Sequence, residues 1–157
     1  MEEPEIAIRA ARPGDVEFLA RSNEAMARET EGIRLDPAAI RAGVRAVLDD
    51  PAKGIYFIAE LDGRPAGCLL ITYEWSDWRN GTFLWIQSVH VEPGLRRRGI
   101  FTRLYRHVEE MARAPGRCGL RLYVEEGNEA ARATYRRLGM DFRGYILFET
   151  RDPLREG

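Results

Sequence analysis

One short segment constrains the fold of this chain more than any other: residues 89–101 read Val-His-Val-Glu-Pro-Gly-Leu-Arg-Arg-Arg-Gly-Ile-Phe. An apolar strand ends at Pro93-Gly94, three arginines follow, and Gly99 opens an amphipathic helix. In such a strand–loop–helix unit, several backbone N–H groups and the positive end of the helix dipole point at one spot, where a phosphate group can bind. Glycine lets the backbone approach the anion closely, and the arginines add positive charge. The segment therefore predicts a diphosphate site.

Two familiar phosphate motifs are excluded by the same residues. The loop has no Gly-Lys-Ser/Thr sequence, so it lacks the lysine and the hydroxyl with which nucleoside-triphosphate loops hold a terminal phosphate and magnesium. Only one glycine lies in the turn, so the segment is not the dinucleotide fingerprint either. A solvated basic loop that merely caps a helix would give the same pattern, and the segment alone leaves that interpretation open.

Length and composition indicate one globular domain over residues 1–157. The chain is 45% apolar and 31% charged, and none of its apolar runs approaches the roughly 20 residues that span a bilayer. The first residues, Met-Glu-Glu-Pro-Glu-Ile, lack the basic and apolar regions of a signal peptide, so we expect a cytoplasmic protein. Cys68 and Cys118 indicate buried thiols, and no residues cluster at metal-ligand spacing.

Charge is nearly balanced overall but unevenly distributed. The net charge of −1 argues against a general nucleic-acid-binding protein. From Arg96 to Arg121 there are eight arginines against two acids, and from Asp15 to Glu31 there are five acids against two arginines. The first region suits an anionic ligand and the second suits a cation, although solvated helix faces would give the same counts.

Apolar periodicity and turn residues predict the element order βααβββαβαβ, in which the last element is one strand or a pair. The turn signals Asp62-Gly63 and Asn80-Gly81 join three strands into an antiparallel meander. We therefore expect an α/β domain with a mixed sheet of six to seven strands, flanked on both faces by about four helices. The expected strands cover residues 6–9, 54–61, 64–75, 82–91, 120–124 and 142–150, and the helices start near residues 13, 36, 100 and 128.

A second pattern lies on the helix that Asn128 is expected to cap. Tyr135 shares one face of this helix with Ala131 and Leu138, a position that suits a core tyrosine as well as a functional one. A phenol with a pKa of about 10 is protonated at neutral pH and can donate its proton to a departing thiolate. A thioester cosubstrate whose diphosphate bound at Gly99 would need such a donor near its sulfur.

Together these segments resemble the GNAT superfamily of acetyl-CoA-dependent N-acetyltransferases. Residues 89–100 match its strand followed by Arg/Gln-x-x-Gly-x-Gly/Ala. Residues 128–140, Asn-Glu-Ala-Ala-Arg-Ala-Thr-Tyr-Arg-Arg-Leu-Gly-Met, are similar to its Asn-x-x-Ala-x-x-x-Tyr…Gly-Phe helix. The element order also agrees from Ile6 to Thr150, so the resemblance covers nearly the whole chain.

The resemblance implies that acetyl-CoA binds beside the strand that ends at Val91. Backbone groups of Val89 and Val91 would pair with the pantetheine arm, which would enter where the sheet splays open beyond Val91. The N–H groups from Arg97 to Thr102 would hold the pyrophosphate, Asn128 would bind the pantetheine, and Tyr135 would protonate the coenzyme A thiolate. No metal is implied. The full set of implied cofactor-binding residues is Val89, His90, Val91, Arg96, Arg97, Arg98, Gly99, Ile100, Phe101, Thr102, Asn128, Ala131 and Tyr135.

The chain departs from the family pattern at Phe101 and at the general base. Phe101 replaces the last glycine or alanine of the loop, and we expect its ring to turn inward along the apolar stripe of the helix. The positions where some relatives carry a base hold Trp85 and Gln87, which cannot accept a proton at neutral pH, although Gln87 could hold a water. Glu74 on the neighbouring strand is the nearest plausible carboxylate and His90 a weaker choice. The base is left unassigned, and a water chain to solvent is an alternative.

The sequence thus predicts an enzyme that transfers an acetyl group from acetyl-CoA to a primary amine by direct attack. The acceptor is an amine of a small molecule or of a protein, and the acidic region from Asp15 to Glu31 favours a cationic one. We expect no nucleic-acid or membrane partner, and a homodimer is compatible with the sequence. Two alternatives stay open: a non-catalytic acyl-CoA-binding module, and a binding protein for nucleic acid or another anionic partner that uses the arginines from Arg96 to Arg121.

Overall fold

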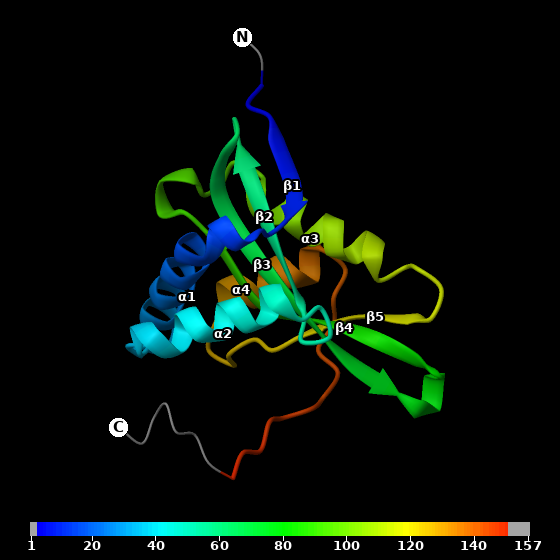
Figure 1. Ribbon diagram of the computed structural model, residues 1–157. Helices are drawn as coiled ribbons and strands as arrows, with labels where there is room; N and C mark the ends of the chain where they lie inside the picture. Colours follow the sequence, from blue (N-terminus) through cyan, green and yellow to red (C-terminus); the bar gives the residue numbers. More distant parts are fainter. Residues whose placement is uncertain (1–2, 151–157) are drawn as a thin grey trace. The chain divides into compact units, whose positions relative to one another are not determined.

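Five strands form one mixed sheet. The computed structural model describes residues 3–150, which fall into two compact units, 3–122 and 123–150. The strands, all in the first unit, are β1 (Ile6–Ala10), β2 (Ile55–Leu61), β3 (Arg64–Ser76), β4 (Gly81–Val91) and β5 (Arg117–Leu122). They lie side by side in the order of the chain (Figure 1). The first four are antiparallel neighbours, and β5 runs parallel to β4.

Left-handed residues make both expected turns of the meander. Asp62 and Gly63, with φ of +50° and +78°, join β2 to β3. Positive φ at both central residues matches the right-handed twist of the two strands and explains why Asp-Gly marks this hairpin. Asn80, with φ of +47°, ends the short connection between β3 and β4. The predicted antiparallel meander is therefore confirmed.

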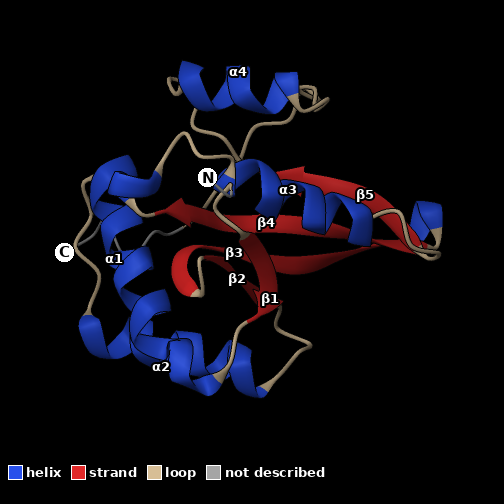
Figure 2. Cartoon of the chain, turned by 90° about the horizontal axis from the view of Figure 1, so that it is seen from above, coloured by secondary structure: helices blue, strands red, loops and turns tan. Residues whose placement is uncertain are grey.

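Helices cover both faces of the sheet, as Figure 2 shows. The first unit contains α1 (Val16–Glu31), α2 (Pro37–Asp49) and α3 (Ile100–Met111). Leu19 of α1 and Val44 of α2 share a buried cluster with Ile58 of β2. Successive side chains of a strand point to opposite faces, so Phe57 lies on the other face, where its ring contacts that of His107 from α3 at 4.7 Å. Helices α1 and α2 thus pack on one face, and α3 packs on the other.

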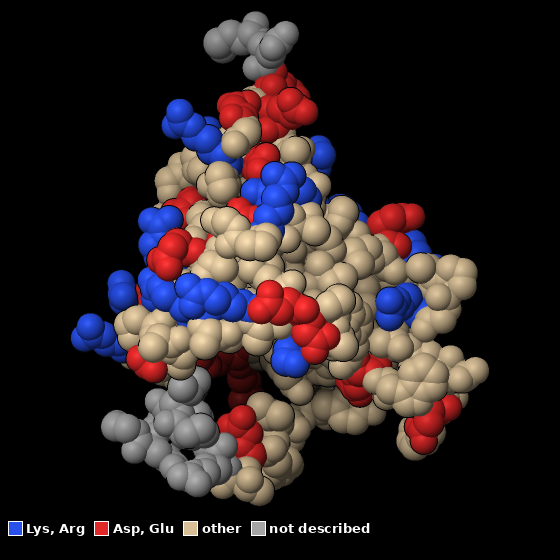
Figure 3. Space-filling view, viewed as in Figure 1, with Lys and Arg blue, Asp and Glu red and all other residues tan. Residues whose placement is uncertain are grey.

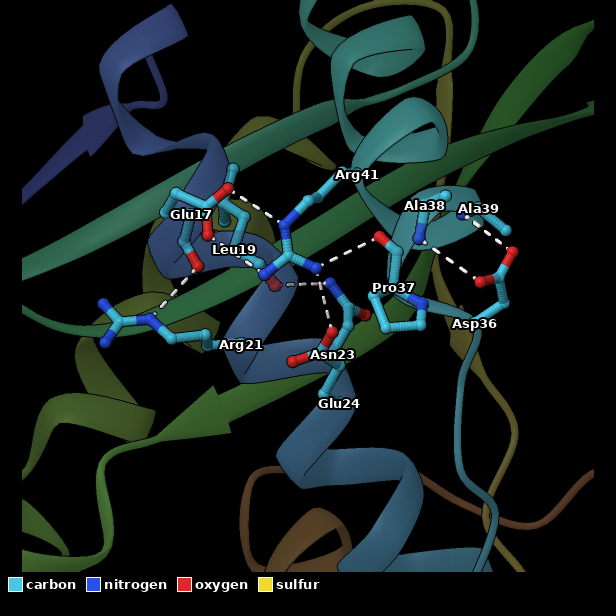
Figure 4. A network of polar contacts seen from close by, with 10 residues as sticks. All are labelled: Glu17, Leu19, Arg21, Asn23, Glu24, Asp36, Pro37, Ala38, Ala39 and Arg41. Carbon is cyan, nitrogen blue, oxygen red and sulfur yellow. Dashed lines mark hydrogen bonds and ion pairs between the residues drawn. The ribbon is translucent and has the colours of Figure 1, made fainter.

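Polar contacts fix α2 against α1. The Asp36 carboxylate accepts hydrogen bonds from two backbone N–H groups of the first turn of α2, which confirms the expected cap. Arg41 of α2 reaches α1 through ion pairs with Glu17 at 2.9 Å and Glu24 at 3.1 Å (Figure 4). Acidic and basic side chains are accordingly interleaved over the face that carries the two helices (Figure 3).

The second unit contains α4 (Glu129–Arg137), and the segment after it corrects one prediction. Residues 142–150 were expected to add one or two strands, but residues 140–150 have no regular secondary structure. The sheet within residues 3–150 therefore has five strands, and six to seven is wrong. A strand is stable only when a neighbour pairs with its N–H and C=O groups, and apolar alternation does not supply one. The segment leaves large apolar side chains exposed, namely Phe142, Tyr145, Ile146, Leu147 and Phe148.

Within residues 3–150, no helix is both long and apolar enough to cross a lipid bilayer. The cytoplasmic location stays a prediction, as does the extent of a single domain over residues 1–157.

Candidate active site

The N-terminus of α3 lies at an open pocket beside the end of β4. A short 3₁₀ turn, Pro93–Leu95, follows the strand, and Gly99 is the N-cap of the helix. Gly99 offers no side chain to cap the helix, and the first intrahelical bond runs from the N–H group of Arg103 to the Gly99 carbonyl, at 3.0 Å. The N–H groups of a first helical turn have no intrahelical acceptor, so this helix end has the donors that the predicted anion site requires.

The backbone of the arginine loop curves around this pocket. Arg97 and Gly99 are both left-handed, with φ of +64° and +81°, and such residues in a turn aim N–H groups toward one concave side. A Cβ atom at Gly99 would meet nothing within 4 Å, so the space in front of the loop is open. The predicted residue Arg98 is exposed and is not among those that line the pocket. The pocket has a volume of about 300 Å³ and is lined by Val91, Arg96, Arg97, Gly99, Ile100, Phe101 and Thr102.

Arg96 links the loop to two other elements. Its Nε atom donates to the carbonyl oxygen of Val91 at 3.1 Å, and an Nη atom pairs with Glu29 of α1 at 2.9 Å. Both side chains of the ion pair are nearly half exposed, so the pair can exchange with a ligand at small energetic cost. Arg96 thus lines the pocket while its guanidinium is paired with Glu29 of α1.

The ring of Phe101 follows the apolar stripe of α3. It stacks on the ring of Tyr105, with centroids 6.5 Å apart and planes 23° from parallel, and the side chain is partly buried. This orientation is the inward one expected from the sequence. Phe101 also belongs to the lining of the pocket, and the inward ring is compatible with an anion at the helix end.

The edge of β4 opens earlier than expected. Leu70 pairs with Ser88 and Ile71 pairs with Ile86, so Gln87 is an extra residue, a β-bulge. Pairing with β5 ends at Ile86 and Leu122. The sequence placed the divergence of the two strands beyond Val91, and this position is wrong because the bulge bends β4 and β5 ends at Leu122. Residues 87–91 of β4 therefore have an edge that β5 does not pair with.

Val89, His90 and Val91 lie along this edge and alternate between the faces of the sheet. His90 pairs with Cys68, which belongs to the cluster under α1 and α2, and the imidazole is buried there. Burial lowers the pKa of His90. Val89 and Val91 point to the α3 face, since neighbours in a strand alternate. The three residues can thus offer backbone groups at the edge while their side chains pack on the two faces.

Glu74, the carboxylate that the sequence offers as a base, is held by two neighbours. One carboxylate oxygen accepts a hydrogen bond from the indole N–H group of Trp85, and the other pairs with Arg121 of β5 at 3.0 Å. The amide of Gln87 donates to the hydroxyl of Thr72 at 2.8 Å. Gln87 is exposed at the bulge, where a water could reach it. The roles of Glu74 and Gln87 in proton transfer stay predictions.

The acidic stretch on α1 is paired with arginines. Glu17 and Glu24 contact Arg41, and Glu29 contacts Arg96. These pairs favour the interpretation of a solvated, ion-paired helix face over that of an open site for a cation.

In the second unit, Asn128 is the N-cap of α4. Its Oδ1 atom accepts a hydrogen bond from the N–H group of Ala131 at 3.1 Å, which confirms the predicted cap and leaves the amide nitrogen as a donor for other groups. Ala131 and Tyr135 are partly buried on this helix. Asn128, Ala131 and Tyr135 therefore share one short helix, and their roles toward a cofactor stay predictions.

Comparison with known proteins decides the family. The model of the Acetyltransferase (GNAT) family matches residues 19–140. The chain belongs to this family. GNAT members are acyltransferases. Among residues 3–150, no group of three or more His, Cys, Asp or Glu side chains could hold a metal ion.

Individual GNAT relatives extend the match over most of the chain. The streptothricin acetyltransferase of Streptomyces lavendulae is 30% identical, over 87% of this chain and 82% of its own length. The thialysine N-epsilon-acetyltransferase of Caenorhabditis elegans is 34% identical over 50% of this chain, which spans about half, 49%, of that protein. A crystal structure of a possible acetyltransferase from Clostridium difficile 630 is 42% identical, with a TM-score of 0.88 over 94% of this chain and 97% of that one. An aminoglycoside N-acetyltransferase in complex with CoA shares the fold, with a TM-score of 0.79 at 16% identity over 96% and 97% of the two chains.

The GNAT motifs did not reveal the neighbours of Glu74. In the sequence, Arg121 is one of eight arginines from Arg96 to Arg121, and no motif marks Phe83. The register Trp85–Arg121 between β4 and β5 is what brings Arg121 across to β3. A parallel register of this kind has no turn to fix it, so the sequence offered no direct signal for this contact.

Proposed function

We propose that this protein transfers an acetyl group from acetyl-CoA to a primary amine by direct attack of the amine on the thioester. One observation carries the proposal: the edge of β4 at residues 87–91, with which β5 does not pair, leads directly to the pocket at the N-terminus of α3. Coenzyme A has an extended pantetheine arm joined to a diphosphate. The arm can pair with an open strand edge, and the diphosphate can bind at a helix N-terminus next to it. The CoA-bound aminoglycoside N-acetyltransferase, which has the same fold, supports the choice of cosubstrate.

The cosubstrate would bind through backbone groups more than through side chains. The pantetheine arm would pair as an added strand with Val89 and Val91, with His90 between them, where β5 leaves the edge open. The pyrophosphate would accept hydrogen bonds from the loop and first turn, residues 97–102, with the Thr102 hydroxyl and the charges of Arg96 to Arg98 nearby. The amide of Asn128 would donate to the pantetheine, beside Ala131.

The reaction would proceed without an acylated enzyme. The neutral amine attacks the carbonyl carbon, a C–N bond forms, and backbone N–H groups of β4 stabilise the resulting oxyanion. The C–S bond then breaks, and Tyr135 donates its proton to the departing thiolate. The nitrogen of the new amide loses its extra proton to water, and a proton from solvent restores the Tyr135 hydroxyl. The ammonium form of the acceptor must first lose a proton to water. Gln87 would hold such a water at the bulge, and Glu74 is the nearest carboxylate.

The acceptor class is a small-molecule amine, with a protein amine as the other option. Two relatives, streptothricin acetyltransferase and thialysine N-epsilon-acetyltransferase, are named for small acceptors, which supports this class. We expect a cytoplasmic enzyme without nucleic-acid or membrane partners.

A thermal melt with and without acetyl-CoA tests the proposal first. At about a hundred times the Kd, binding to the native state adds about 2.7 kcal/mol to the free energy of unfolding. For a chain of this size the midpoint should rise by roughly 5–10 °C. Release of free thiol on addition of amines should follow. An unchanged midpoint would contradict the cosubstrate, and a raised midpoint without thiol release on any amine would favour a non-catalytic acyl-CoA-binding module.

A further inference from the structure

The guanidinium of Arg121 lies between an aromatic ring and a carboxylate, two groups that commonly form binding sites for cations. Its guanidinium carbon lies 3.7 Å from the centre of the Phe83 ring, and one of its nitrogens lies 3.0 Å from the Glu74 carboxylate. The indole N–H group of Trp85 holds the second carboxylate oxygen. A carboxylate fixed by a neutral donor beside an aromatic face is an arrangement that binds organic cations. Here an internal cation fills it.

Arginine side chains cover the aromatic face of this site. Phe83 is only 8% exposed, and Arg79 also lies over its ring at 5.1 Å. Pairing of β2 with β3 ends at Ile71, so the β3–β4 hairpin continues beyond the rest of the meander, and Figure 1 shows it extending past α1 and α2. Withdrawal of Arg121 would vacate the closer of the two arginine positions over the ring, where a cationic ligand could take its place.

The site and the bulge of β4 lie on the same face of the sheet. Glu74 pairs with Phe83, and Trp85 pairs with both Thr72 and Arg121, so these side chains project from one face. The contact between Gln87 and Thr72 places the bulge beside them. Ile71 and Leu84, which are fully buried, project from the opposite face, toward α3. Helix α3 therefore does not obstruct an amine that approaches the edge of β4 from the face on which Glu74 lies.

The ion pair is suited to exchange. The side chains of Glu74 and Arg121 are 41% and 31% exposed, and pairs with this much solvent contact contribute little to folding stability. The long arginine side chain can move into water while the carboxylate stays fixed by Trp85.

We infer that Glu74 and Phe83 bind a second cationic group of the acceptor, which replaces the guanidinium of Arg121. This inference rests on the proposed function, because it places the reacting amine at the bulge. Trp85, which holds Glu74, lies only two residues from Gln87 along β4, so the site for the second charge is near the bulge. The acceptor class is therefore a diamine or larger polyamine, whose second positive charge lies between Glu74 and Phe83 while its other amine reaches the bulge.

Matched amines test the inference through thiol release from acetyl-CoA. Straight-chain diamines of increasing length are compared with monoamines that have a methyl group in place of the second amine. We expect one diamine length to be preferred over its monoamine by roughly tenfold or more in kcat/KM, the range of a charge-assisted hydrogen bond. Equal kcat/KM for all pairs would overturn the inference and leave the acetyltransferase proposal intact.

Two variants and a control locate the effect. Glu74→Gln should reduce the ratio of diamine to monoamine kcat/KM toward one, and Arg121→Gln should lower KM for the preferred diamine because the internal competitor is gone. Glu110→Gln removes the same charge from an exposed ion pair with Arg113 on α3 and should leave the ratio unchanged. A Glu74→Gln enzyme that loses turnover on both amines yet keeps the ratio would assign Glu74 to proton transfer and overturn the inference. A raised KM for the preferred diamine in Arg121→Gln would also overturn the inference.

A binding measurement separates this inference from the proposed function. Calorimetric titration of pentane-1,5-diamine into the protein should give a Kd that weakens in Glu74→Gln and tightens in Arg121→Gln. If acetyl-CoA raises the melting midpoint but no amine is acetylated, the proposed transfer fails, and this titration still decides the cation site. Should Glu74→Gln fail to fold, the direction of change in Arg121→Gln decides it.

Discussion

Arg96 and Glu29 join the pocket at the N-terminus of α3 to helix α1 through an ion pair of 2.9 Å. The same guanidinium donates to the carbonyl oxygen of Val91, at the open edge of β4. An arginine of the proposed diphosphate site is thus occupied by groups of the protein itself. A bound diphosphate would compete with Glu29 for this guanidinium, so α1 and the cosubstrate are linked through one side chain.

Glu29→Gln should strengthen acetyl-CoA binding. The substitution removes the competitor for Arg96, and because exposed ion pairs contribute about 0–1 kcal/mol, the Kd should tighten by at most about fivefold. Calorimetry on the wild type and the variant measures the change, with Glu110→Gln as a variant of equal charge away from the pocket. Weaker binding in Glu29→Gln would show instead that the pair orients Arg96 for the diphosphate.

Gly99→Ala should destabilise the protein through the backbone alone. Gly99 has φ of +81°, and a Cβ atom there has nothing within 4 Å, so strain and not crowding sets the effect. A non-glycine residue in this region costs about 1–2 kcal/mol, which lowers the midpoint by roughly 2–8 °C. Relaxation of the strained loop should also weaken acetyl-CoA binding. Gly94→Ala is the matched control, since Gly94 also has open space around it but no positive φ; an equal effect in both variants would contradict the explanation.

Local rules predicted the turns, the caps and the start of α3, because each depends on residues a few positions apart. Asp36, Asp62-Gly63 and Gly99 all adopt the conformations that their residue types favour. The early opening of β4 and the contact of Arg121 with Glu74 could not be predicted in this way. Both depend on the register between strands distant in the chain, which is set by packing of the whole sheet.

The apolar segment after α4 shows the limit of pattern alone. Residues 142–150 have the composition of a strand, but a strand also requires a neighbour to pair with, and none of the described strands pairs with them. Composition thus gave the wrong strand count, whereas the motif on α4, which depends on local helical spacing, placed Asn128 correctly as a cap.

Tyr135→Phe should lower kcat while sparing acetyl-CoA affinity. The variant keeps the ring and removes the proton that the proposed mechanism gives to the thiolate, and a general acid of this kind contributes about a hundredfold or more. Thiol-release kinetics and calorimetry measure the two quantities. Tyr145→Phe, at an exposed tyrosine of the same unit, serves as the control. Unchanged kcat in Tyr135→Phe would remove Tyr135 from the mechanism.

His90 should make the folded state less stable as the pH falls below neutral. Burial lowers the pKa of His90 in the folded protein below its ordinary value of 6.5, although the nearby charges of Glu29 and Glu92 oppose this shift and Arg96 reinforces it. As the pH falls, His90 therefore binds a proton at a higher pH in the unfolded chain than in the folded protein. The contribution to stability is complete above pH 6.5 and is lost as the pH falls from there through the folded-state pKa.

The variant His90→Gln should accordingly reduce the slope of the melting midpoint between about pH 7 and about pH 5.5, a range in which most carboxylates stay ionised. His107, whose pKa is also lowered by burial, contributes a slope of the same sign, so His107→Gln measures the second part separately. An unchanged slope in His90→Gln would mean that the imidazole is hydrated in the folded protein. In that case the backbone of His90 could still pair with an added strand, because the edge of β4 does not depend on the side chain.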